Sequence, residues 1–82
     1  MLTLNKIVIS GIGEEYIAIN ENNVLIRLNE VGKEILELYM SYENIVHVSS
    51  VISEKYNVPF EDIKRDVEKF ISDLTNVKFI HQ

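Results

Sequence analysis

Hydrophobic residues follow two different periods along the chain, and the change between them falls within residues 23–38. From Val24 to Leu28, every second residue is apolar and belongs to one side, which is the pattern of a strand with one buried face. From Val31 onward, the apolar positions recur with the spacing of one helix face. Asn29 stands between the two patterns, where its side chain can cap the free N–H groups of a helix start. The sequence therefore predicts a strand that runs directly into a capped helix.

Two more strands are predicted upstream of this junction. Residues 6–10 alternate in character, and residues 16–19 are rich in residues that favour strands. Residues 11–15 contain two glycines and predict a flexible turn, because glycine tolerates positive φ. Residues 20–23 are polar and supply a hairpin turn into the third strand. The alternative is that the first twelve residues are disordered.

Three helices are predicted downstream. The first should run from Glu30 to about Tyr42, and the second from Ile45 to Tyr56 after an Asn44 cap. Asn57 suits the left-handed conformation that ends many helices. A third helix should begin at Pro59, where the missing N–H does no harm, and run to about Thr75. Residues 77–80 are predicted to form a short extended tail or a last strand.

The buried faces of the helices follow from the same periodicity. Gly32 weakens the first helix by roughly 1 kcal/mol relative to alanine, so we expect another element to pack closely over it. The second helix is expected to bury Val48, Ile52 and Tyr56. The apolar positions of the third helix are Phe60, Ile63, Val67, Phe70, Ile71 and Leu74.

Three strands followed by three helices, the last two joined by a tight turn, predict an α+β fold of the winged helix-turn-helix type. Eighty-two residues suffice for a single domain that spans 1–82. The chain has no cysteine, and no apolar run approaches the ~20 residues that span a bilayer. Its start lacks the features of a signal peptide, so we expect a cytoplasmic protein that does not enter a membrane.

Charge and side-chain chemistry narrow the function classes. The net charge of -5 disfavours nucleic-acid binding, which depends mainly on Lys and Arg. No serine, threonine or lysine stands in a recognisable catalytic motif, and His47 and His81 lack the spacing of a zinc site. We therefore expect neither an enzyme nor a bound cofactor or metal.

The junction also carries a family resemblance. The run Leu28-Asn29-Glu30-Val31-Gly32, followed by an amphipathic helix, resembles the signature of PqqD-like proteins. Tyr56-Asn57-Val58, Asp66-Val67 and the helix end from Phe70 to Leu74 follow with the order and spacing of that family. PqqD-like proteins are RiPP recognition elements, which bind the leader peptides of ribosomally made, modified peptides. The resemblance covers roughly Tyr16 to the C-terminus and implies a non-catalytic leader-peptide-binding protein that stands alone.

A leader could bind as an added strand, because a sheet edge presents unpaired N–H and C=O groups. The resemblance places the leader between the third strand and the third helix. The expected peptide-binding residues are Val24, Leu25, Ile26, Arg27, Leu28, Lys64, Val67, Glu68 and Ile71. Val67 and Ile71 could equally be core residues. If a folded Ile71→Asp protein bound leader with unchanged affinity, the opposite flank of the helix, around Asp66, Lys69 and Asp73, would be the next candidate.

The resemblance also implies partners other than the leader. The core peptide that is attached to the leader in the precursor would be delivered to a modifying enzyme, either a radical SAM enzyme or a lasso-peptide leader peptidase and cyclase. Val46 is expected to be exposed and to contact that enzyme or a second copy in a homodimer. The alternative function is a winged-helix DNA-binding or regulatory domain. Its third helix would carry Lys64, Arg65 and Lys69 among acidic residues that oppose phosphate contact.

Overall fold

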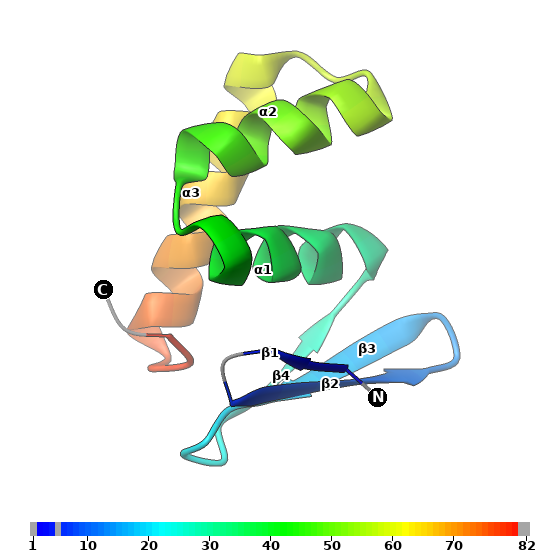
Figure 1. The fold of residues 1–82 in the computed structure, drawn as a ribbon, viewed down its shortest axis with the longest axis vertical. Coiled ribbons are helices and arrows are strands. Elements are labelled where there is room, and N and C mark those ends of the chain that lie inside the picture. Colours follow the sequence, from blue (N-terminus) through cyan, green and yellow to red (C-terminus); the bar gives the residue numbers. More distant parts are fainter. Residues whose placement is uncertain (1, 5, 81–82) are drawn as a thin grey trace.

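An antiparallel sheet forms the base of the molecule, α1 lies over one of its faces, α2 lies on the far side of α1, and α3 runs alongside from α2 towards the sheet (Figure 1). The structure is a computed structural model that describes residues 2–4 and 6–80, with side chains from residue 6 onward. The elements, in chain order, are β1 (Leu2–Leu4), β2 (Ile7–Ile12), β3 (Glu15–Ile19), β4 (Leu25–Leu28), α1 (Glu30–Tyr42), α2 (Ile45–Tyr56) and α3 (Phe60–Asn76). The predicted α+β, winged helix-turn-helix-like fold is confirmed.

The strands pair in the order β1-β2-β3-β4, so β4 lies at an edge of the sheet. The register places Tyr16 opposite Leu28 and Ile19 opposite Leu25. The turn between β2 and β3 is tighter than predicted, because β2 continues to Ile12 and only Gly13 has a positive φ, of 62°. Gly11 therefore belongs to the strand rather than to the turn.

β1 is an additional strand that the hydrophobic pattern did not predict. It has three residues, too few for an alternating pattern to stand out, and it pairs with β2 through Leu4 and Ile7. Lys6, in the tight connection between them, has a left-handed φ of 67°. The alternative prediction, that the first twelve residues are disordered, is thus wrong for those of them that the structure describes.

Asparagine caps fix the helix boundaries where they were predicted. Asn29 Oδ1 accepts a hydrogen bond from the Gly32 N–H at 2.7 Å, and Asn44 Oδ1 accepts one from the His47 N–H at 3.0 Å. Asn57 ends α2 in the left-handed conformation, with φ 55° and ψ 48°. Pro59 is the N-cap of α3 rather than its first residue.

The core lies between the sheet and α1 and continues between the helices. Its buried apolar side chains are Ile7, Ile9, Ala18, Leu28, Ile35, Leu36, Val48, Ile52, Ile63, Val67, Ile71, Leu74, Phe79 and Ile80. Tyr56 was expected inside, but it is 37% exposed, and its hydroxyl donates a hydrogen bond to Glu34 Oε2 at 2.9 Å. The Tyr56 hydroxyl needs a hydrogen-bond partner, and the Glu34 carboxylate at the surface provides one that an apolar core would not.

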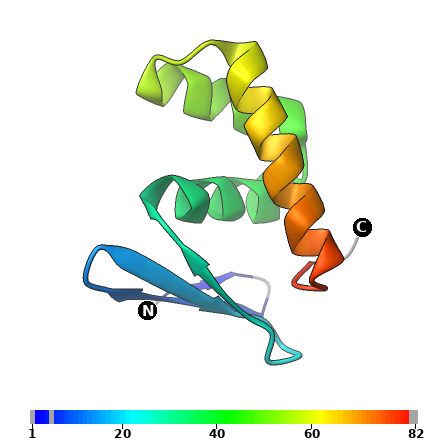
Figure 2. The ribbon, with the colours of Figure 1, turned by 180° about the vertical axis from the view of Figure 1, so that it is seen from behind.

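The segment after α3 is a compact turn and not the predicted extended tail or strand. Lys78 has φ 62°, and the Phe79 N–H donates to the Leu74 carbonyl at 2.8 Å. This turn brings Phe79 and Ile80 into the core, near the hairpin between β3 and β4 (Figure 2). His81, expected in a frayed tail, lies outside the described residues.

Among the described residues, no helix is both long and apolar enough to cross a membrane.

Candidate functional site

The outer edge of β4 is open within the described chain, because β3 is its partner in the sheet. The Asn20 N–H donates to the Val24 carbonyl at 3.1 Å, so Asn20 and Val24 form a hydrogen-bonded pair of the β3–β4 hairpin. Antiparallel pairs alternate between hydrogen-bonded and non-hydrogen-bonded residues. With the observed register, Leu25 and Arg27 therefore direct their N–H and C=O groups away from β3. These backbone groups form the open edge.

The side chains of β4 divide between the two faces of the sheet. Val24 and Ile26 are half-buried and Leu28 is buried, all on the face that the helices cover. Leu25 is 54% exposed on the other face. Arg27 is also exposed there, and its Nη2 lies 3.0 Å from Glu15 Oε2. The strand thus offers an apolar side toward the helices and a free backbone edge.

A pocket of about 320 Å³ opens where β4 passes into α1 and α3 approaches. Figure 2 shows β4 and α3 on the same side of the molecule. The lining residues are Arg27, Leu28, Asn29, Val31, Gly32, Ile35, Asp66 and Phe70. The floor is mainly apolar, and Asp66 supplies a carboxylate from α3.

Gly32 lies at the start of α1, beside Leu28 of β4 and Phe70 of α3. A Cβ atom at this position would lie 3.5 Å from Leu28 Cδ2 and 3.6 Å from Phe70 Cε1. It would also lie 3.2 Å from Asn29 Oδ1, a tight contact with the capping oxygen. The contacts with Leu28 and Phe70 are of ordinary van der Waals length, so the expected close passage of another element does not by itself require glycine here, and the tight contact is with the cap of the same helix.

The flank of α3 that faces the pocket is the one that carries Asp66 and Phe70. Val67 and Ile71, two of the expected peptide contacts, are 0% and 1% exposed and belong to the core. Lys64 and Glu68 pair at 3.7 Å on another side of the helix, each about 160° around the axis from Asp66. None of these four residues lines the pocket beside β4.

Most charges of α3 are paired along the helix. Arg65 lies 3.7 Å from Asp62, and Lys69 Nζ lies 2.8 Å from Asp73 Oδ2. The hydrogen bond to Asp73 raises the pKa of Lys69. Asp66 is exposed and has no ion pair with another described residue. The pocket therefore has one unbalanced charge on its α3 side.

Polar contacts between β3 and α1 support the junction. The Tyr16 hydroxyl donates to Glu30 Oε2 at 2.7 Å, and this bond raises the pKa of Tyr16. Lys33 Nζ lies 4.9 Å from the centre of the Tyr16 ring. Both contacts tie the first turn of α1 to the strand next to β4.

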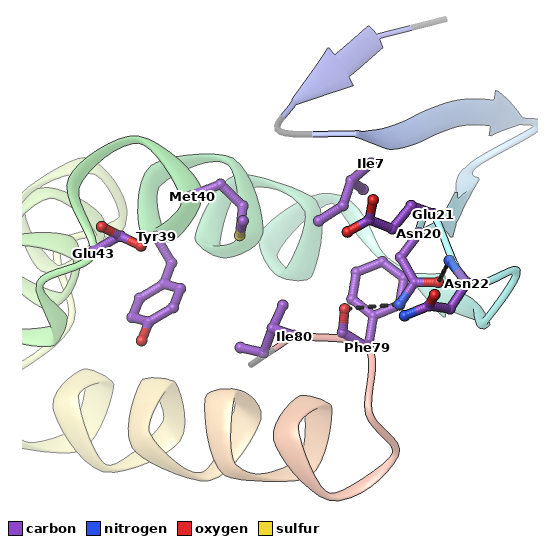
Figure 3. Close-up of a pocket in the computed structure, with 9 residues that line it drawn as sticks. All are labelled: Ile7, Asn20, Glu21, Asn22, Tyr39, Met40, Glu43, Phe79 and Ile80. Carbon is purple, nitrogen blue, oxygen red and sulfur yellow. Dashed lines mark hydrogen bonds between the residues drawn. The ribbon is translucent and has the colours of Figure 1, made fainter. Parts of the chain in front are cut away.

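A second, larger pocket of about 540 Å³ lies at the far end of α1 (Figure 3). Its walls come from the β3–β4 hairpin, the last turn of α1 and the C-terminal turn, and they include the acidic Glu21 and Glu43. Asn20 lies at its edge and donates to the Phe79 carbonyl at 2.9 Å. β4, whose outer edge is open, contributes no residue to its lining, so this pocket is less suited to a peptide that pairs with β4.

Within the described residues, no three His, Cys, Asp or Glu side chains gather as metal ligands would. His47 is exposed as expected, and its ring packs against Tyr42 with the ring centres 4.4 Å apart and the planes tilted by 55°. Val46 is also exposed, at 54%.

Comparisons with known proteins agree with this geometry. The family model of coenzyme PQQ synthesis protein D, PqqD, matches residues 14–80. The chain therefore belongs to the PqqD family, which confirms the resemblance predicted from the junction. This membership supports a non-catalytic protein of RiPP biosynthesis over a DNA-binding winged helix.

Among solved structures, the chain is similar to TbiB1 in complex with the TbiA(beta) leader peptide. The two share 21% sequence identity, with 92% of this chain and 90% of that chain covered and a TM-score of 0.71. At this identity, the likeness demonstrates a shared fold. A comparison with curated proteins finds no match.

Proposed function

We propose that this protein is a non-catalytic peptide-binding module that captures the leader of a ribosomally made precursor peptide. The observation that carries the proposal is the open edge of β4 beside an apolar pocket under α3. An extended peptide can add to such an edge through its main chain and place alternate side chains in the pocket. TbiB1, which shares the fold, was solved with a leader peptide bound.

The peptide would lie along Val24–Leu28, antiparallel or parallel to β4. Its main chain would pair with the N–H and C=O groups of Leu25 and Arg27, since these point away from β3. One of its side chains would enter the pocket against Leu28 and Phe70. Val67 and Ile71 would support this wall from the core, and Lys64 and Glu68 would lie outside the groove.

The alternative, a DNA-binding winged helix, has weaker support. The chain carries 8 basic and 13 acidic residues, and each basic residue of α3 has an acidic partner on the same helix. A helix that binds phosphate needs cations that are free to contact it. The PqqD family match also points away from DNA.

A modifying enzyme, such as a radical SAM enzyme or a leader peptidase and cyclase, would receive the captured precursor. Val46 and Tyr42 offer an exposed apolar surface at the opposite end of α1 from the pocket. A 13-residue helix is about 20 Å long, so this surface would stay accessible while peptide occupies the groove. The same surface could form a homodimer. Because ribosomal precursors are made in the cytoplasm, the protein would act there.

The test is a pair of titrations with fluorescent ligands. One ligand is a synthetic leader segment of a ribosomal precursor peptide, and the other is a DNA duplex. We expect micromolar or tighter binding of the peptide and no salt-dependent binding of DNA. Tight DNA binding with a steep salt dependence would overturn the proposal.

Two variants of one residue separate backbone from side-chain contributions. Arg27→Pro removes a backbone N–H that points away from β3, a position where an edge strand tolerates proline. Arg27→Ala keeps that N–H and removes the charge. We expect the proline variant to lose about tenfold or more in peptide affinity, equivalent to about 1.4 kcal/mol, and the alanine variant to lose much less. Equal losses would argue against strand addition.

A further inference from the structure

The charge of Asp66 distinguishes the α3 side of the β4 pocket from its surroundings. Asp66 and Phe70 are four residues apart, so they lie on the same flank of the helix, and both line the pocket. Phe70 contributes apolar surface to it. Asp66 contributes a carboxylate that is exposed and not engaged by any described cation.

The remaining charges near this pocket are already matched. Arg27, on the strand side, lies 3.0 Å from Glu15. Lys69 and Arg65, the cations nearest to Asp66 along α3, are paired with Asp73 and Asp62. A ligand in the pocket would therefore meet a net negative charge at Asp66.

From this arrangement we propose that Asp66 is a specificity-determining residue that selects a lysine or arginine in the bound peptide. The inference rests on the proposed function, because it requires a peptide strand along β4. A side chain in the pocket would occupy the apolar floor, and a basic side chain nearby in the peptide would reach the carboxylate. The ligand is thus a peptide segment with a bulky apolar residue and a basic residue at a fixed spacing.

The effect of this contact on affinity is modest and its effect on sequence preference is clear. Ion pairs between exposed side chains change affinity by roughly two- to fivefold, and salt screens them. A peptide with an acidic residue in place of the basic one would meet repulsion instead. Selection among many competing sequences amplifies such differences, since specificity is a difference between affinities.

The experiment uses a display library of short random linear peptides as the probe, selected on the immobilised full chain. Three proteins are compared, namely the unaltered chain, Asp66→Lys and Glu68→Lys. Glu68→Lys is the matched control, because it makes the same charge change on the same helix about 160° from Asp66. Thermal melts establish that both variants, which alter exposed residues, remain folded.

We expect the unaltered chain to enrich peptides with lysine or arginine at a constant spacing from an apolar residue. Asp66→Lys should lose this preference and enrich aspartate or glutamate at that position, whereas Glu68→Lys should retain the original preference. Individual peptides should then show the two- to fivefold change in affinity, larger at low salt than at high salt.

The contradicting outcomes separate the two proposals. If all three proteins enrich peptides with an apolar residue but the same charge preference or none, Asp66 does not determine specificity and the peptide-binding function stands. If Glu68→Lys changes the preference instead, the groove lies on the other flank of α3. If no peptide is enriched on any of the proteins, the peptide-binding function fails and the role of Asp66 fails with it.

Discussion

The side-chain amide of Asn20 joins the hairpin before β4 to the end of the chain through Phe79. Its Nδ2 donates to the Phe79 carbonyl at 2.9 Å and to the Lys78 carbonyl at 3.2 Å. Its Oδ1 accepts from the Val24 and Asn22 N–H groups, each at 2.9 Å. One buried amide therefore sets the hairpin that leads into the open edge and also anchors the C-terminal turn.

Replacement of Asn20 by alanine should destabilise the fold by about 2–4 kcal/mol, because a buried polar group without a partner costs about 1–3 kcal/mol. Unfolding in urea measures this change. Asn22→Ala is the control, since the Asn22 side chain is exposed and should matter by less than about 0.5 kcal/mol. Equal stability of the two variants would show that the Asn20 contacts do not hold the C-terminal turn.

Ile71→Asp should unfold the domain rather than weaken peptide binding in a folded protein. Ile71 is 1% exposed, and an unpaired carboxylate there would destabilise the fold by more than about 3 kcal/mol. The total stability of a domain of this size is only about 6 kcal/mol. Ser72→Asp adds the same charge at the next, exposed position of α3 and should melt near the unaltered protein. A folded Ile71→Asp protein that binds no peptide would contradict this prediction and would indicate that Ile71 contacts the peptide.

The stability of the α1–α2 contact should depend on pH through Glu34. Burial acts to raise the pKa of Glu34, but hydrogen bonds from Lys55 Nζ at 2.6 Å and from the Tyr56 hydroxyl outweigh it, so the pKa falls below its ordinary value. A lowered pKa in the folded state means that the ionised carboxylate stabilises the fold above the unfolded pKa of about 4.3. That stabilisation is lost as pH falls through the folded pKa.

Glu34→Gln isolates this contribution. The unaltered protein should be more stable than the variant at neutral pH, and the difference should shrink as pH falls below about 4.3. Denaturant unfolding of both proteins across the acid range measures it. A difference that stays constant with pH would mean that the charge of Glu34 is not involved.

Local chemistry explains why the helix boundaries could be predicted from the sequence. Asn29, Asn44 and Asn57 act through hydrogen bonds or backbone angles that involve residues at most five positions away. A short window of sequence therefore contains the information that determines them.

The residues that were predicted less well depend on contacts between distant parts of the chain. Val77–Ile80 has the composition of a strand, but Asn20, almost sixty residues away, holds it in a turn. The α3 residues that line the pocket beside β4 are Asp66 and Phe70, and Phe70 lies next to Gly32 of α1. The helical period places Phe70 and Ile71 on one apolar stripe, and it does not reveal which of them the rest of the fold covers.

The central claim is that a peptide adds to the edge of β4, and amide hydrogen exchange tests it most directly. The Leu25 and Arg27 N–H groups should exchange rapidly in the free protein, because they point away from β3, and those of Ile26 and Leu28 should exchange slowly. Addition of a bound leader peptide should slow exchange at Leu25 and Arg27 and leave Ile26 and Leu28 nearly unchanged. Saturating peptide with no new protection at Leu25 and Arg27 would contradict the account.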